Sequence, residues 1–310
     1  MNEAFDGAIF LTGPTATGKS GVAFELARRL NGEIISVDSM QVYRGLDVGT
    51  AKPASHERRE IPHHLIDTVD LKESFDAARF VAMAGSAHAQ ILERGRLPIY
   101  CGGTGFYFKA LFEGLGGSPP PDPLLRGKLE MTSLGTLLRE LKEKDPLTYE
   151  RIDRANPRRV VRAVEVIRLT GRPFSAQRAG WGARAPTPSG RRLFALSRSP
   201  ADLRQRIETR VDRMFAEGLV EETSRLLEQG LASNRTAMQA LGYRQVVEHL
   251  QALRGFAETV QLIKTRTWQF ARRQLAWIRH QLQPHWIELR PDSETEEIAA
   301  RIIHGESVEK

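Results

Sequence analysis

AIFLTGPTATGKS, the stretch from Ala8 to Ser20, decides the fold of this chain. An apolar run enters a loop at Gly13, and residues 13–20 fit the pattern G-x-x-x-x-G-K-[ST] at every fixed position. The apolar residues that follow recur at helical spacing, namely Val22, Ala23, Leu26, Ala27 and Leu30. The stretch therefore predicts a strand, a glycine-rich loop and the N-terminus of a helix, which is the context in which this pattern binds phosphate.

This loop has the chemistry of a phosphate cradle. Its glycines let backbone N–H groups curl around phosphate oxygens, and the helix N-terminus adds partial positive charge. Lys19 is placed to neutralise the outer phosphates, and the Ser20 hydroxyl is placed to bind a Mg2+ that bridges them. The expected phosphate-binding residues are Gly13, Thr15, Ala16, Thr17, Gly18, Lys19 and Ser20. The loop alone does not say which reaction the phosphates undergo.

The composition limits the compartment and the class of partner. The single cysteine, Cys101, rules out an intrachain disulfide and fits a reducing compartment. We expect no signal peptide and no membrane span, because no apolar run reaches about 18 residues, and a cytoplasmic location is the default. The net charge of +7 is concentrated, since residues 151–210 carry fifteen arginines, no lysine and four acids. Guanidinium groups pair well with phosphate, so this block favours a nucleic acid over the alternative of a solvated arginine-rich surface.

Apolar runs and helical patterns alternate along much of the chain. Further strands are predicted at residues 33–39, 97–101 and 192–197, with a last one at 285–289, and helices at 75–94, 201–229, 237–253 and 258–283. This alternation predicts an α/β fold with a parallel sheet covered by helices on both faces. Ser20, Asp38 and Thr104 each follow one of three successive strands. Because such sheets bind ligands beyond the carboxyl ends of their strands, we expect these three residues to converge on one cleft.

Two segments rich in proline, glycine and serine bracket a purely helical block. They are residues 116–123 and 172–190, and the predicted helices between them are 134–144 and 156–170. The second helix is well marked, with Asn156 as N-cap, Pro157 in the first turn and Gly171 just past the end. We therefore expect a discontinuous P-loop core domain, residues 1–116 and 190–310, interrupted by an inserted helical domain, residues 117–189.

Asp38 ends the second predicted strand and has three possible roles. It could be a metal ligand, a general base beside the phosphates, or a residue that caps a turn. The third strand, the usual alternative place for a metal-binding acid, ends in Gly-Gly-Thr instead. The expected cleft thus offers a carboxylate from Asp38, a hydroxyl from Thr104 and an amide from Gln41. That set suits the removal of a proton from a nucleophile better than phosphoanhydride hydrolysis.

The motifs occur in an order that resembles one family. They are GPTATGKS (13–20), DSMQVY (38–43), GTAKP (49–53), PHHLID (62–67), GGTGFY (102–107), NPRRVVRA (156–163), LGYR (241–244) and RRQLAW (272–277). Together they resemble the bacterial tRNA dimethylallyltransferases, also called the tRNA isopentenyltransferase family. The resemblance spans roughly residues 8–290. It implies transfer of a dimethylallyl group from its diphosphate to N6 of adenosine 37 in tRNAs that read codons starting with U, with release of diphosphate.

The resemblance implies a role for each residue of the expected cleft. The loop and Mg2+ would hold the diphosphate, and one arginine of the row Arg204, Arg206, Arg210 and Arg213 would reach over it. Arg210 is the first choice and Arg213 the second. Asp38 would accept the proton of the amine and Thr104 would hold the reacting groups in line. Gln41 would read the adenine edge bidentately.

The same resemblance implies that the chain binds the anticodon stem-loop of tRNA and flips the target base out of its stack. The expected tRNA contacts in the expected cleft are Asp38, Ser39, Met40, Gln41 and Thr104. On the inserted helix they are Arg158, Arg159, Val160, Val161 and Arg162, and on the core side Gln239, Gly242, Tyr243, Arg244, Arg272, Arg273, Gln274, Trp277 and Arg279. No obligate protein partner is expected. The alternatives are a small-molecule or nucleoside kinase that uses ATP, and a non-catalytic RNA-binding P-loop switch.

Overall fold

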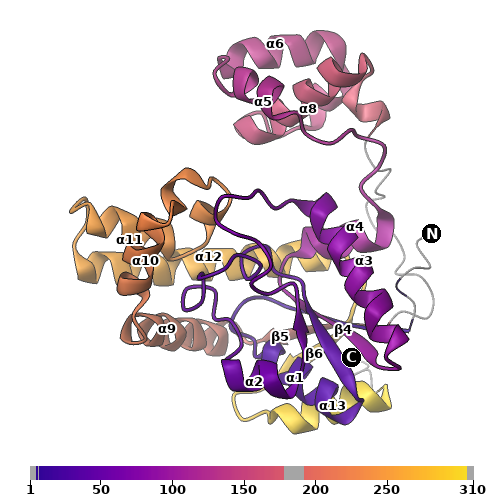
Figure 1. Ribbon diagram of the computed structural model, residues 1–310, viewed down its shortest axis with the longest axis vertical. Coiled ribbons are helices and arrows are strands. Elements are labelled where there is room, and N and C mark those ends of the chain that lie inside the picture. Colours follow the sequence, from indigo (N-terminus) through magenta and orange to yellow (C-terminus); the bar gives the residue numbers. More distant parts are fainter. Residues whose placement is uncertain (1–4, 6, 178–191, 306–310) are drawn as a thin grey trace. The chain divides into compact units, whose positions relative to one another are not determined.

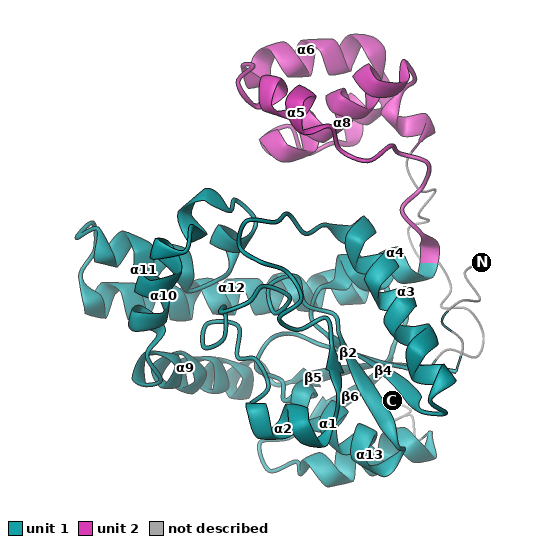
Figure 2. Ribbon diagram, viewed as in Figure 1, with its two compact units in different colours: residues 1–112, 183–310 teal, residues 113–182 magenta. Residues whose placement is uncertain are grey.

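The computed structural model describes residue 5, residues 7–177 and residues 192–305, which form two compact units. The first unit comprises residues 1–112 and 183–310, and the second comprises residues 113–182 (Figure 2). The segment expected to be inserted, residues 117–189, ends outside the described residues.

A six-stranded parallel sheet forms the centre of the first unit (Figure 1). Its strands are β1 (Ile9–Thr12), β2 (Gly32–Ser36), β3 (His63–His64), β4 (Leu97–Gly102), β5 (Arg192–Arg198) and β6 (His285–Leu289). Their order is β3-β2-β4-β1-β5-β6, and every neighbouring pair is parallel. The parallel α/β sheet predicted from the sequence is confirmed. The segments that follow β1, β2 and β4 therefore all lie at the carboxyl ends of the strands, on the same side of the sheet.

Two hydrophobic clusters cover the two faces of this sheet. On one face, Ile9, Leu11 and Ile99 pack with α1 (Lys19–Arg29) and α13 (Thr295–His304). On the other face, Phe10 and Tyr100 belong to a larger cluster with residues of six α-helices. These helices are α3 (Ala77–Glu93), α4 (Gly105–Glu113), α9 (Pro200–Ala216), α10 (Leu219–Glu228), α11 (Tyr243–Leu250) and α12 (Phe256–Gln281). The alternation of these residues along β1 explains why the strand is apolar throughout.

Three features of the first unit differ from the sequence prediction. The helix expected over 201–229 is two helices, because Gly218 takes a φ of +92° between α9 and α10 (Leu219–Glu228). The helix expected from residue 237 begins at Tyr243, after Gly242 at φ +100°. Strand β3 and the helices α2 (Ser55–Glu60), α4 and α13 were not predicted. Strand β3 and helix α2 are short and have no long apolar run.

The second unit is helical throughout the residues that the structure describes. Its helices are α5 (Pro123–Glu130), α6 (Leu134–Lys144), α7 (Pro146–Arg151) and α8 (Pro157–Thr170). Leu137 and Leu141 of α6 pack against Val160 and Val164 of α8 in a small core. The side chain of Asn156 caps α8 through the N–H of Arg159, and Gly171 ends the helix in the left-handed region, as predicted. Within the described parts of both units, we find no helix with the length and apolar character to cross a membrane.

Glu33 ties the sheet to the end of helix α3. Its side chain is 2% exposed and accepts two hydrogen bonds from Arg94, at 3.0 and 2.7 Å. His64 Nε2 lies 2.6 Å from the same carboxylate, and Arg96 lies 3.3 Å from it. Burial by itself raises the pKa of Glu33, but the hydrogen bonds from Arg94 and His64 outweigh it and the net pKa is lowered.

Glu33→Gln should lower the free energy of unfolding by about 1–3 kcal/mol near neutral pH, because buried contacts lose a charged acceptor. The folded-state pKa of Glu33 lies below its unfolded value. The stabilisation that Glu33 contributes is therefore complete at pH values above its pKa in the unfolded state. It is lost as the pH falls through its pKa in the folded state. Urea unfolding at a series of pH values should show the two proteins converging in acid. Glu228→Gln, an exposed carboxylate on α10, is the control; a difference that does not change with pH would contradict the prediction.

Candidate active site

The phosphate-binding pattern forms a tight loop between β1 and α1. Ala16 and Gly18 take positive φ values of 65° and 98°, and α1 begins directly after Gly18. The buried Thr17 hydroxyl donates to the carbonyl of Pro14 at 2.9 Å, and the Lys19 ammonium donates to the same carbonyl at 3.3 Å. Burial lowers the pKa of Lys19, so the loop holds a cation that is poorly solvated. An anion at the loop would compensate for this lost solvation.

One N–H group of the expected cradle is already occupied. The backbone N–H of Thr15 donates to Oε1 of Gln274 at 2.9 Å, and Nε2 of Gln274 donates to the carbonyl of Gly103 at 2.9 Å. Thr15 is therefore not a phosphate ligand through its N–H in this conformation, which corrects the sequence prediction. Gln274, which we expected to contact tRNA, instead joins the phosphate loop to the turn that follows β4.

That turn, residues 102–105, is shaped by glycines at three close approaches. A Cβ on Gly102 would overlap the carbonyl group of Val37, one on Gly103 would overlap Gln274, and one on Gly105 would overlap the Trp277 ring. The N–H of Thr104 donates to the carbonyl of Val37 at 3.2 Å. Because Val37 precedes Asp38, the turn brings the backbones of Thr104 and the Asp38 segment together. Trp277, another expected tRNA contact, is half-buried against the turn.

The Asp38 carboxylate has one occupied oxygen and one free oxygen. Its Oδ1 accepts the N–H groups of Met40 at 2.8 Å and Gln41 at 3.2 Å. Among the described residues, no hydrogen bond reaches the other oxygen. Lys19 and Arg210 both interact electrostatically with this carboxylate. Asp38 therefore caps a turn, as one of the three readings had it, and also keeps an acceptor beside two cations.

Three arginines at or after the end of β5 approach the phosphate loop. The Nε of Arg206 donates to the carbonyl of Ala16 at 2.9 Å, and the Nε of the buried Arg198 donates to the carbonyl of Thr17 at 2.9 Å. Arg210 reaches the carbonyl of Thr50 at 3.5 Å, and its pKa is lowered by burial, with Asp38 opposing this shift. The sequence prediction chose Arg210 and then Arg213, and it missed Arg198. The spacing of Arg206 and Arg210, four residues apart on α9, was the signal that both share one face.

The Gln41 side chain is held in a network of hydrogen bonds. Its Oε1 accepts from the Ser36 hydroxyl at 2.9 Å, and its Nε2 donates to the carbonyl of Thr50 at 3.2 Å. Both ends of the amide are thus engaged. The bidentate reading of an adenine edge by Gln41, expected from the sequence, would first require these bonds to break.

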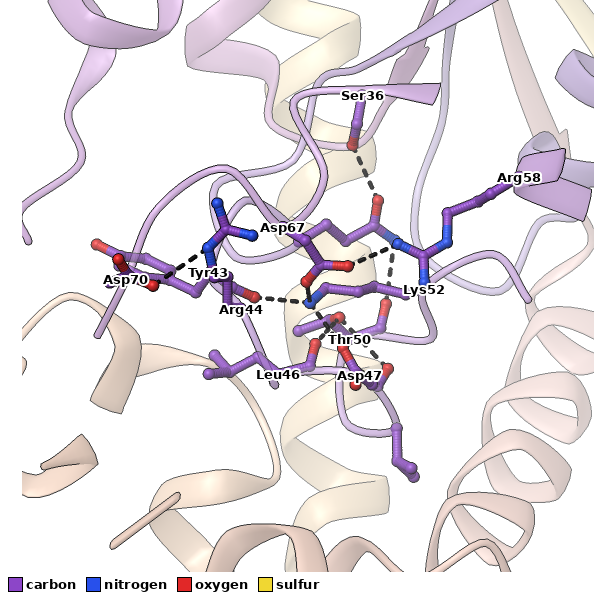
Figure 3. Close-up of polar contacts among 12 residues, drawn as sticks. Ser36, Tyr43, Arg44, Leu46, Asp47, Thr50, Lys52, Arg58, Asp67 and Asp70 are labelled. Carbon is purple, nitrogen blue, oxygen red and sulfur yellow. Dashed lines mark hydrogen bonds and ion pairs between the residues drawn. The ribbon is translucent and has the colours of Figure 1, made fainter. Parts of the chain in front are cut away.

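The loop that follows Gln41 is fixed by a buried lysine (Figure 3). The Lys52 ammonium donates to the carbonyl of Tyr43 at 2.6 Å and forms ion pairs with Asp47 at 2.7 Å and Asp67 at 2.5 Å. Arg58 binds the other oxygen of Asp67 at 2.6 Å. The Gly49–Pro53 motif and the Pro62–Asp67 motif therefore hold each other in place.

The residues expected to contact tRNA differ in how exposed their side chains are. The exposed ones are Arg158, Arg159, Gln239, Arg244, Arg272, Arg273 and Arg279, while Ser39 and Met40 are half-buried. Val160 and Val161 lie in the core of the second unit, and Tyr243 is buried with its hydroxyl 2.6 Å from Glu222, so these side chains are not available to RNA. Gly242 is also buried and has no side chain to offer. Arg162 is half-buried and donates to Glu165 and to the carbonyl of Pro119, which removes it from the expected free cationic face.

The oxygen atoms near the loop are too few for a Mg2+ site made of protein alone, but they suit a Mg2+ ion that is also bound by substrate phosphates. Ser20 is exposed at the first turn of α1 and offers a hydroxyl, and Asp38 is the carboxylate that interacts with Lys19. The described residues contain no group of three or more histidine, cysteine or acidic side chains suited to a metal. Mg2+ commonly keeps its waters and binds through one or two protein oxygens plus substrate phosphates, which matches this set.

The parallel sheet, the glycine-rich loop at the start of α1 and the cations around it define an α/β protein of the P-loop class. Comparison with known proteins narrows this class. Residues 41–281 match the family described as IPP transferase, and the chain belongs to that family.

Relatives cover nearly the whole chain. A tRNA dimethylallyltransferase 1 of Trichlorobacter lovleyi is 44% identical over 94% of this chain and 97% of its own length. The tRNA dimethylallyltransferase of Geobacter metallireducens is 45% identical over 90% of this chain and 92% of its own. Among solved structures, the full-length tRNA isopentenylpyrophosphate transferase of Bacillus halodurans has a TM-score of 0.69 at 35% identity, with 96% of both chains covered. A eukaryotic dimethylallyltransferase captured acting on tRNA has a TM-score of 0.75 at 28% identity, over 91% of this chain and 74% of that one.

Gln274→Ala should weaken the binding of inorganic diphosphate with Mg2+ by about 10-fold, because the N–H of Thr15 and the carbonyl of Gly103 lose their shared partner and the loop loses its fixed shape. Isothermal titration calorimetry measures this affinity directly. Gln261→Ala, at an exposed position of the same helix, is the matched control. Equal affinities for the two variants would show that the phosphate loop does not depend on Gln274.

Proposed function

We propose that this chain transfers a dimethylallyl group from dimethylallyl diphosphate to N6 of adenosine 37 in tRNAs that read codons beginning with U. Its coarser activity, dimethylallyl transfer to tRNA, is that of the family to which the chain belongs. The observation that supports the proposed chemistry is Asp38, which keeps one carboxylate oxygen without a hydrogen bond from the described residues while it interacts with Lys19 and Arg210. A base and two cations in one site suit a reaction that removes a proton and releases an anion.

The reaction exchanges one bond for another at a single carbon. N6 of the adenine forms a bond to C1 of the dimethylallyl group while the bond from C1 to the diphosphate oxygen breaks, and its electron pair leaves with the diphosphate. An exocyclic adenine amine is a poor nucleophile, so it must lose a proton as the new bond forms. Asp38 accepts that proton on the oxygen that the turn leaves unoccupied. The Thr104 hydroxyl, which has no partner among the described residues, holds the amine in line.

The leaving diphosphate is stabilised by the phosphate loop and its arginines. Backbone N–H groups of residues 16–20 and the Lys19 ammonium surround it, and Arg210 and Arg206 approach from α9. Ser20, exposed at the first turn of α1, is the residue that would hold Mg2+. When bound, the ion supplies positive charge to the oxygens on which charge grows.

The tRNA presents its anticodon stem-loop, and the target base leaves its stack to meet Asp38. Arg158 and Arg159 of α8 are exposed on the second unit, and Arg272, Arg273 and Arg279 are exposed on α12. Arginines of this kind bind phosphates and position the RNA, while the reacting site selects the base. We place this enzyme in the cytoplasm, with tRNA and dimethylallyl diphosphate as its partners.

The direct test incubates the protein with Mg2+, dimethylallyl diphosphate and an anticodon stem-loop RNA that carries the target adenine, and then weighs the RNA. We expect a mass gain of one dimethylallyl group that depends on that adenine. Asp38→Ala should lower the rate by about 10²–10⁴-fold, the usual contribution of a general base, with RNA affinity retained.

Each outcome of this assay separates the candidate functions. ATP consumption on a small acceptor, without RNA modification, would identify a kinase. Nucleotide-dependent RNA affinity without a covalent product would identify a binding switch. If the Asp38 variant lost RNA affinity but kept its rate at saturating RNA, Asp38 would be a binding residue.

Replacing both Arg158 and Arg159 by alanine should weaken RNA binding and reduce its dependence on salt. Each phosphate contact removed should lower the slope of log affinity against log salt by about 0.7–0.9. Arg168→Ala removes an arginine from the same helix that is paired with Glu140 at 2.6 Å, and serves as the control. Filter binding at several salt concentrations gives the slopes. An unchanged slope in the double variant would refute a phosphate role for the pair.

A further inference from the structure

Glu222 is a buried carboxylate that no step of the reaction uses. It lies on α10, is 4% exposed, and forms no ion pair with a described lysine or arginine. Its oxygens instead accept the backbone N–H groups of Asp47 at 3.3 Å, Val48 at 2.9 Å and Gly49 at 3.4 Å. The Tyr243 hydroxyl donates to the same carboxylate at 2.6 Å. These hydrogen bonds offset the cost of burying a carboxylate away from water.

Tyr243 completes the contact from α11. Burial raises the pKa of the Tyr243 phenol, and the nearby Glu222 carboxylate raises it further, so the hydroxyl stays protonated and donates. The N–H of Gly49 donates to the same hydroxyl at 3.1 Å. A Cβ on Gly49 would overlap the Tyr243 ring, so the glycine permits this approach. Glu222 and Tyr243 thus hold one backbone segment, residues 47–49, from two sides.

The held segment leads directly to the reacting groups. Residue 50 follows it, and the carbonyl of Thr50 accepts hydrogen bonds from Nε2 of Gln41 at 3.2 Å and from Arg210 at 3.5 Å. The backbone N–H of Gln41 in turn donates to Oδ1 of Asp38 at 3.2 Å. The position of residues 47–50 therefore bears on Gln41, on Arg210 and, through Gln41, on Asp38.

We propose that Glu222 is a positioning residue for dimethylallyl transfer: with Tyr243 it fixes residues 47–50, and this segment sets Gln41 and hence the carboxylate of Asp38. Glu222 acts through these residues and does not touch the substrates. The proposal rests on the function proposed above. Displacement of a reacting group by about 1 Å can lower the rate by about 100-fold. The loss of a residue that positions Asp38 indirectly should therefore have a measurable effect on the rate.

Glu222→Gln tests the proposal with the least change in shape. The amide nitrogen is a donor that faces backbone N–H donors, so the segment must shift. The prenylation rate at saturating RNA and dimethylallyl diphosphate should fall by about 10- to 100-fold. The dissociation constant for stem-loop RNA should stay unchanged, because Glu222 is buried. Glu221→Gln, the exposed neighbour on the same helix, should keep the wild-type rate.

A double-variant comparison separates positioning from a loss of stability. If Glu222 acts through Gln41, the variant Gln41→Ala with Glu222→Gln should be no slower than the slower of its two single variants. A general loss of folded protein would instead multiply the two effects. Tyr243→Phe serves if Glu222→Gln does not fold: it removes one hydrogen bond to Glu222, and the saturated rate should fall by about 2- to 10-fold.

The proposal and the proposed function fail in different ways. Wild-type and Glu221→Gln proteins that prenylate RNA, together with Glu222→Gln or Tyr243→Phe at the full rate, would overturn only the positioning role. Multiplied effects in the double variant would also overturn it. A wild-type protein that adds no dimethylallyl group to RNA would overturn the function itself and the positioning role with it.

Discussion

The close approach of the turn after β4 to the end of β2 is the constraint on which the site depends. Gly102 lies against the Val37 carbonyl group so closely that a Cβ would overlap it. The N–H of Val37 donates to the carbonyl of Cys101 at 2.8 Å, and the N–H of Thr104 donates to the carbonyl of Val37. This packing carries Thr104 to Asp38, which directly follows Val37. Any side chain at residue 102 would push apart the two segments that carry Asp38 and Thr104.

Residues of the C-terminal half of the chain hold this arrangement in place. Gln274 of α12 joins Thr15 to Gly103, and Arg198 and Arg206 bind carbonyls of the phosphate loop. The loop is thus fixed by residues far away in sequence as well as by its own glycines. This explains why the pattern of residues 13–20 identifies a phosphate loop without defining its ligand. The distant residues that fix the loop lie on β5, α9 and α12.

Local patterns made the sheet and the main helices predictable, whereas long-range partners could not be read from the sequence. Helix α6 and strand β6 have the bounds that periodicity predicts, because their apolar spacing is unbroken. Tyr243 and Gln274 were expected to contact tRNA because the family resemblance implies it for their motifs. Tyr243 is instead buried at a contact with a residue 21 positions away, and Gln274 binds groups 171 and 259 positions away. Contacts across such separations leave no periodic pattern in the sequence.

The charges around the phosphate loop explain why a polyanion is favoured there. Lys19 and Arg210 each have a pKa lowered by burial, and they repel each other, while Asp38 offsets only part of that repulsion. Two half-buried cations beside one carboxylate leave net positive charge at the loop, so a polyanion is favoured there whatever its organic group. A diphosphate that departs with an extra electron pair gains more from these cations than the intact substrate does. In the proposed reaction, the same charges would therefore bind the substrate and lower the barrier to its cleavage.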